Sequence, residues 1–170
     1  MSPPSSAEWL EQIAEYWREE HPERDFERVR ALLALGRLSF QMPAFQKRML
    51  APFQLSPSDY SILSALRRAG GTRTLVPGDL YSALQCTPGG LTKMIARLER
   101  QGLVERLTDE ADGRRARIRL TAKGAAVERK AGTEYLAGAD RLLSDLAPAQ
   151  IDQINDALAL LLESFEREDG

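Results

Sequence analysis

Residues 75–123 read LVPGDLYSALQCTPGGLTKMIARLERQGLVERLTDEADGRRARIRLTAK, and this stretch decides the fold. It begins with a short helical pattern that places Leu80 and Leu84 on one face. After the segment Cys-Thr-Pro-Gly-Gly comes a longer helical pattern, whose apolar residues have the spacing of one buried stripe: Leu91, Met94, Ile95 and Leu98. Gly102 follows its last turn, where a glycine commonly ends a helix.

Two short runs of β-type sequence follow this helix, at residues 103–107 and 116–120, with a polar turn between them. The order helix, turn, helix, hairpin predicts a winged helix-turn-helix. The fold class expected for the chain is therefore mainly α, with a small β-hairpin wing and helices on either side of the DNA-binding core.

The second helix of this unit has features suited to the major groove of DNA. A helix that enters the groove needs small polar residues at its N-terminus, and backbone N–H groups there can meet a phosphate. The residues expected at this end are Thr87, Pro88, Gly89 and Gly90. Three more residues fall outside the apolar stripe and are expected to face the groove: Thr92, Lys93 and Arg97. The alternative is an ordinary solvated helix.

The turn between the two β-type runs ends in Arg114 and Arg115. A guanidinium at the tip of a hairpin suits a narrow minor groove, where the negative potential is strong. An ordinary charged hairpin is again the alternative, but the order of the whole unit favours DNA binding.

The stretch resembles the MarR family of bacterial transcriptional regulators. Three motifs carry the resemblance: TPGGLTKMIARLERQGL at 87–103, DEADGRR at 109–115, and LTAKG at 120–124. The resemblance extends over nearly the whole chain from Asp25 onward, and its wing motif adds Asp112 to the predicted DNA-binding residues. It implies a homodimer that binds a palindromic operator in double-stranded DNA and is released by a small molecule or by oxidation.

Composition is consistent with this hypothesis. Among 170 residues with a formal net charge of −2, the segment 67–130 holds 14 Lys and Arg against 7 Asp and Glu, and the remainder holds 9 against 18. A basic lobe is therefore expected around the winged helix. With one cysteine, no secretory signal pattern and no long apolar run, we expect a cytoplasmic protein without an internal disulfide or a membrane partner. We find no motif for a catalytic site, metal or cofactor, so an enzyme is not expected.

The flanking sequence predicts further helices. Residues 7–20 form one with Ser6 as its cap, residues 25–51 form a long one with a kink at Pro43, and Ser56 caps the next. Residues 72–76 add a strand beside the wing, and two helices follow Thr121, one to about residue 146 and one from Pro148. We expect residues 1–55 and 124–170 to form the dimerisation side and residues 56–123 the DNA-binding core, all in one compact domain. Apolar residues that cover only their own subunit are the alternative to a dimer.

A ligand site is suggested by a second resemblance, to the PecS-like and urate-responsive branch of the family. The matching residues are Trp17, in a motif W-x-x-E-x-P-x-x-D, and Arg68, in Leu-Arg-Arg-Ala-Gly-Gly. The branch places an Asp where this chain has Ser61, which argues against urate itself and leaves an aromatic or anionic effector. A more distal arginine of that branch corresponds to Arg97 or Arg106. Simple packing of Trp17 and a surface charge at Arg68 are the alternatives.

Two other functions remain open from the sequence. One is a winged helix that contacts proteins and has no operator. The other is a redox-sensing regulator that uses Cys86, although a single cysteine beside apolar residues is more often a small buried hydrophobe.

Overall fold

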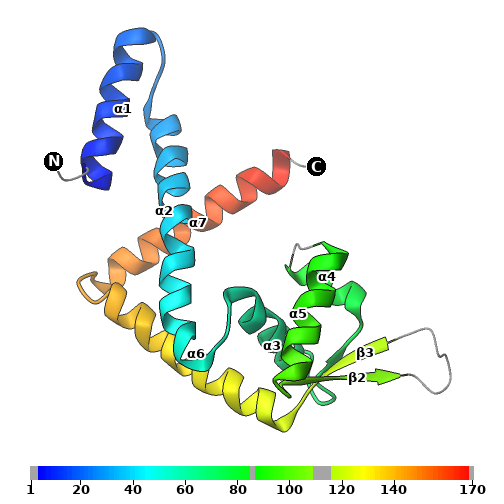
Figure 1. The fold of residues 1–170 in the computed structure, drawn as a ribbon. Coiled ribbons are helices and arrows are strands. Elements are labelled where there is room, and N and C mark those ends of the chain that lie inside the picture. Colours follow the sequence, from blue (N-terminus) through cyan, green and yellow to red (C-terminus); the bar gives the residue numbers. More distant parts are fainter. Residues whose placement is uncertain (1–3, 85–86, 109–115, 169–170) are drawn as a thin grey trace.

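The computed structural model describes residues 4–84, 87–108 and 116–168. Its elements follow the predicted order: α1 (Ser6–Glu20), α2 (Glu27–Leu50), the 3-10 helix η1 (Ala51–Phe53), α3 (Pro57–Arg68), β1 (Thr74–Leu75), α4 (Pro77–Leu84), α5 (Pro88–Arg100), β2 (Val104–Thr108), β3 (Ala116–Leu120), α6 (Ala122–Leu142) and α7 (Pro148–Glu168). Figure 1 shows α3, α4, α5 and the strands gathered in one lobe, and α6 leading from this lobe to α2. The fold is that of a winged helix-turn-helix with long flanking helices.

The helix starts are set by capping side chains. Ser56 accepts a hydrogen bond from the Asp59 N–H, and the Asp59 carboxylate accepts one from the Ser56 N–H in return. Thr121 caps α6 with its hydroxyl oxygen alone, which accepts a hydrogen bond from the Gly124 N–H. At α1 the cap is Ser5, which forms a capping box with Glu8, so the prediction of Ser6 was wrong by one residue.

The long helix α2 departs slightly from the prediction at its start. It begins at Glu27, because the Asp25 side chain accepts a hydrogen bond from the Glu27 N–H and holds the preceding turn. The helix then continues through Pro43 to Leu50. Helix α6 ends at Leu142 rather than near residue 146, since the chain turns before Pro148.

A three-stranded antiparallel sheet forms the wing side of the lobe, with the strand order β1-β3-β2. Strand β3 is central, pairing Thr74 with Arg119 on one side and Val104 with Leu120 on the other. The predicted strand beside the hairpin is therefore confirmed, in a shorter form.

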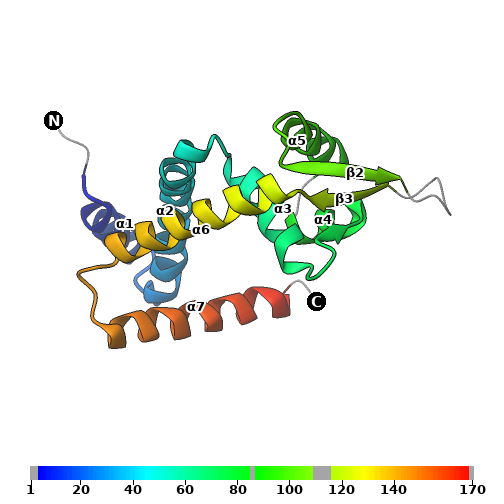
Figure 2. The ribbon, with the colours of Figure 1, turned by 90° about the horizontal axis from the view of Figure 1, so that it is seen from below.

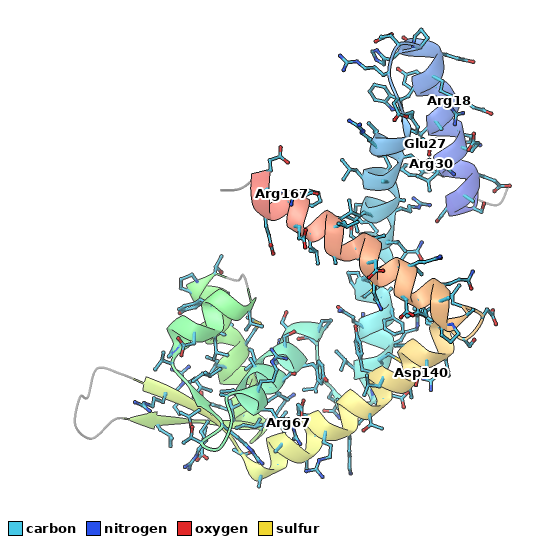
Figure 3. The ribbon with its side chains drawn as sticks, turned by 180° about the vertical axis from the view of Figure 1, so that it is seen from behind. Arg18, Glu27, Arg30, Arg67, Asp140 and Arg167 are labelled. Carbon is cyan, nitrogen blue, oxygen red and sulfur yellow. The ribbon has the colours of Figure 1, made fainter. Side chains whose placement is uncertain are left out.

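The core lies inside the lobe and continues to the first half of α6. Its largest fully buried apolar residues are Leu50, Ile62, Leu63, Leu66, Leu80, Leu91, Leu98 and Ile118. Helix α6 packs against the α5–β2 connection at Gly124, where an added Cβ would collide with the carbonyl oxygen of Leu103. Arg67 of α3 joins the same contact region, lying 3.1 Å from the carboxylate of the buried Glu128 on α6 (Figure 3).

The flanking helices leave large apolar side chains uncovered. Helix α7 has no buried residue, and Figure 2 shows it running separately from the lobe. On α2, Phe40 is 83% exposed. The other exposed large apolar residues of α1, α2, α6 and α7 are Tyr16, Trp17, Val29, Leu32, Leu38, Met42, Leu136, Leu142, Ile154, Leu158, Leu160, Leu162 and Phe165.

Candidate nucleic-acid interface

Helix α5 separates an apolar face from a polar one. Leu91, Ile95 and Leu98 are buried against the lobe, as the stripe predicted. Thr92 and Lys93 are exposed on the other side of the helix. Helix α5 follows α4 in the lobe as the second helix of a helix-turn-helix (Figure 1), and its exposed residues are the polar ones. We refer to α5 below as the recognition helix.

At the N-terminus of this helix, more of the polar groups are hydrogen-bonded to each other than the sequence indicated. Thr87 is the N-cap and accepts a hydrogen bond from the Gly90 N–H at 3.2 Å. Pro88, at the first position, has no N–H, and its carbonyl accepts from the Thr92 hydroxyl at 3.0 Å. Among the described residues no acceptor is found for the Gly89 N–H, which leaves it available to a phosphate at this helix end.

Arg97 differs from the expectation that it faces the groove. Its guanidinium donates to Asp59 Oδ1 from Nη2 at 2.6 Å and from Nε at 3.1 Å. Asp59 lies in the first turn of α3, and its side chain is 2% exposed. The structure therefore places the Arg97 charge in an ion pair within the lobe. The periodicity of α5 could not reveal this, because the partner is 38 residues away on another helix.

Arg100 occupies the outward position that was assigned to Arg97. It is exposed, and it lies seven residues after Lys93, about two helical turns along the same face. Its Nε makes one long hydrogen bond, 3.4 Å, to the Ala96 carbonyl. Among the residues that the structure describes, neither Lys93 nor Arg100 has a carboxylate partner, so both cations are available to phosphates. The same i, i+7 spacing in the sequence would have identified Arg100.

Several other basic residues of the lobe are paired internally. Arg106 lies 3.0 Å from Glu99, and Arg119 lies 2.8 Å from Glu105 across the hairpin. The hydrogen bond that Arg119 Nε donates to the Glu105 carboxylate raises the pKa of Arg119. Each pair takes up one cation and one carboxylate, so the net charge of the lobe is unchanged, but fewer of its Lys and Arg side chains are free to meet DNA.

The wing itself is described only along its strands. Thr108 pairs with Ala116 at the end of the hairpin, and residues 109–115 lie outside the described residues. The predictions for Asp112, Arg114 and Arg115 fall in that segment. Cys86, the candidate redox residue, is also outside the described residues.

Of the three residues expected at an effector site, Trp17 lies apart from Ser61 and Arg68 within one subunit. Trp17 stacks on His21 with ring centroids 5.0 Å apart and lines a hollow of about 460 Å³ at the α1–α2 turn. Ser61 and Arg68 line a different hollow, of about 280 Å³, and the two hollows share no residue. In Figure 1, α1 lies beside the start of α2, whereas α3 follows its end. Within one subunit, Trp17, Ser61 and Arg68 therefore do not line a single pocket.

The hollow beside Arg68 has a mixed lining. It adjoins a second hollow of about 250 Å³, and Tyr60 and Ser61 line both. Burial raises the pKa of Tyr60, with Glu128 and Tyr135 adding to the shift, so its hydroxyl keeps its proton at neutral pH. Tyr60 also stacks with Tyr135 of α6, with ring centroids 6.1 Å apart. An aromatic surface, a hydroxyl donor and a nearby guanidinium are thus close together.

Neither a metal site nor a membrane span is found in the part of the chain that the structure describes. No three His, Cys, Asp or Glu side chains there gather as a metal would require. None of the described helices combines the length and the hydropathy of a membrane span.

Comparison with known proteins gives consistent results. The sequence model of the MarR family matches residues 53–115. The HTH-type transcriptional regulator PecS of Dickeya dadantii (strain 3937) is 30% identical over 132 residues, which is 78% of this chain and 80% of that protein.

Two solved structures share the fold at lower identity. A mutant of MarR from E. coli in complex with operator DNA has a TM-score of 0.66 and 22% identity, with 86% of this chain and 97% of that one aligned. The organohalide-sensing RdhR regulator in its 2,4-dichlorophenol-bound form has a TM-score of 0.70 and 18% identity, with 83% of this chain and 82% of that one aligned.

Proposed function

The chain belongs to the MarR family of transcriptional regulators, and we propose that it binds a palindromic operator in double-stranded DNA as a homodimer, represses transcription there, and is released by a small aromatic or anionic effector. The observation that carries the DNA-binding part is the outward face of the recognition helix. Lys93, near the small polar turn at Thr87, and Arg100, at the last residue of the helix, project there without a described carboxylate partner. Its matched relatives are transcriptional regulators, and we propose no catalytic activity.

The homodimer is supported by the apolar side chains that one subunit leaves in water. An amphipathic helix must bury its apolar face against another element, and α7 has no buried residue within the subunit. Phe40 of α2 and Leu160 and Leu162 of α7 are each more than half exposed. In this proposal residues 1–55 and 124–170 form the dimerisation side, and residues 56–123 form the DNA-binding part.

The effector site is proposed at the joined hollows beside Tyr60, rather than at Trp17. Arg68 supplies a planar cation at the edge, and Tyr60 supplies an aromatic face. The RdhR regulator of similar fold has been solved with 2,4-dichlorophenol bound. Release of DNA then requires that the effector bind more tightly to the conformation that fits the operator poorly.

Selection from a random DNA pool tests the central proposal. We expect an enriched palindrome with half-sites about 10 base pairs apart, as two recognition helices related by a two-fold axis require. Light scattering on the same preparation should give twice the mass of the chain. A pool that yields no enriched motif, with DNA binding absent even at low salt, would instead favour a winged helix that contacts proteins.

A further inference from the structure

We propose that Arg97 is a positioning residue, which holds the recognition helix in its reading orientation through Asp59 and does not itself contact DNA. The inference rests on the proposed function, because it assigns a role within operator binding. The proposed role affects the preference for the operator over other DNA more than the affinity for DNA in general.

The Asp59 carboxylate is fully engaged by its neighbours. Oδ1 accepts both N–H groups of Arg97, and Oδ2 accepts the Ser56 N–H at 2.9 Å and the Ser56 hydroxyl at 2.8 Å. Arg97 Nη2 also donates to the Ser56 hydroxyl at 3.2 Å. The cap of α3 and the third turn of α5 are therefore joined in one hydrogen-bonded cluster.

This cluster fixes the rotation of the recognition helix about its own axis, which the apolar contacts of the helix do not. Leu91, Ile95 and Leu98 hold the helix against the lobe, but hydrophobic burial does not depend on direction and tolerates a small rotation about the helix axis. A guanidinium that places two N–H groups on one buried carboxylate oxygen is strict in its geometry. Rotation of α5 would break these bonds and leave a buried charge unpaired, which is costly.

The competing role for Arg97 is a phosphate contact, since its side chain is 43% exposed. The bonds to Asp59 and Ser56 use Nε and Nη2, so a phosphate contact would have to be made through Nη1 while the guanidinium stays on Asp59. Lys93 and Arg100 are exposed and have no described carboxylate partner, so they serve as the comparison. The two roles differ in their salt dependence, because removing one cation that binds a phosphate should reduce the slope of log affinity against log salt by about 0.9.

The test uses the full chain and the operator selected above, with a scrambled duplex of the same length. Dissociation constants are measured at several salt concentrations for Arg97→Gln, Arg97→Lys, and two comparison variants. Lys93→Gln removes an outward cation, and Arg30→Gln removes an exposed ion pair with Glu27 on α2, far from the lobe. If the natural chain selects no operator, the proposed function has failed before Arg97 is examined.

For a positioning role, Arg97→Gln loses at least about tenfold in operator affinity, the scale of one misplaced base contact. Its affinity for the scrambled duplex and its salt slope stay as in the natural chain. Lys93→Gln lowers the slope and weakens both duplexes, and Arg30→Gln changes neither. Equal losses on both duplexes with a reduced slope in Arg97→Gln would establish a phosphate contact and overturn the proposal, as would no loss at all.

Arg97→Lys guards against a simple failure to fold. It keeps the positive charge beside Asp59, but a single ammonium cannot reproduce the two N–H groups of the guanidinium. We expect it to fold and to show a partial loss of operator preference. Full operator preference in this variant, or unfolding of both Arg97 variants, would assign the pair to fold stability alone.

Discussion

The backbone of Gly124 passes so close to the carbonyl oxygen of Leu103 that no Cβ can be accommodated between them. Leu120 Cδ1 closes the same space, 2.8 Å from the position that a Cβ would take. Gly124→Ala should therefore force α6 away from the α5–β2 connection and destabilise the fold by about 1–3 kcal/mol, the usual range for overpacking. Urea denaturation measures the change.

Gly78→Ala is the matched control for that substitution, because no atom lies within 4 Å of its added Cβ. Gly78 is in the first turn of α4, where alanine should be neutral or slightly stabilising. A Gly124→Ala variant as stable as Gly78→Ala would mean that α6 can shift without cost.

Lys93→Gln should weaken binding to any DNA duplex and reduce the salt slope by about 0.9, because one cation that binds a phosphate is removed. Lys47→Gln, an exposed lysine on α2, should leave the slope unchanged. Titration by fluorescence anisotropy at four or more salt concentrations gives both slopes. Equal slopes in the two variants would show that Lys93 does not face DNA.

Arg114→Ala should weaken operator binding by about 1–3 kcal/mol if the wing places this arginine in the minor groove, taking a specific base contact as the scale. We expect the fold to be unaffected, because an arginine is seldom part of a hydrophobic core. Arg115 is adjacent, so Arg114→Ala combined with Arg115→Ala is the stronger form. An affinity that is unchanged in the double variant excludes the wing contact.

Truncation of the chain before Pro148 removes the exposed apolar residues of α7. Without this helix the remaining dimerisation surface should be incomplete, and the product should aggregate or unfold. Size-exclusion chromatography with light scattering provides the measurement. A soluble, folded monomer would show that α7 is dispensable for assembly.

Arg68→Ala should weaken the binding of aromatic carboxylates at least about tenfold, the order expected when a charge-assisted hydrogen bond is removed. Trp17→Phe should bind them as the natural chain does, because Trp17 lines a separate hollow. Calorimetric titration and operator release are followed in parallel. The opposite pattern, with weaker binding in Trp17→Phe and unchanged binding in Arg68→Ala, would move the effector site to the α1–α2 turn.

The features that the sequence predicted well are local ones. The apolar stripe of α5, the cap at Ser56 and the end of α5 at Gly102 each depend on residues a few positions apart. The role of Arg97 was not predictable in this way, because periodicity shows which side of a helix is polar but not which distant carboxylate lies beside it. The same limit applies to Trp17 and Arg68, whose separation is set by the direction of α2.

Helix α6 can act as a lever arm. Its 21 residues span about 30 Å, and the close contact at Gly124 lies near the end that carries the winged lobe. Consider a dimer joined at the opposite end of α6. A rotation of the helix by about 5° about that end would displace each winged lobe by about 3 Å over this length. A change of a fraction of an ångström in side-chain packing near the dimer axis would therefore be magnified at the DNA, where the distance between two half-sites is fixed.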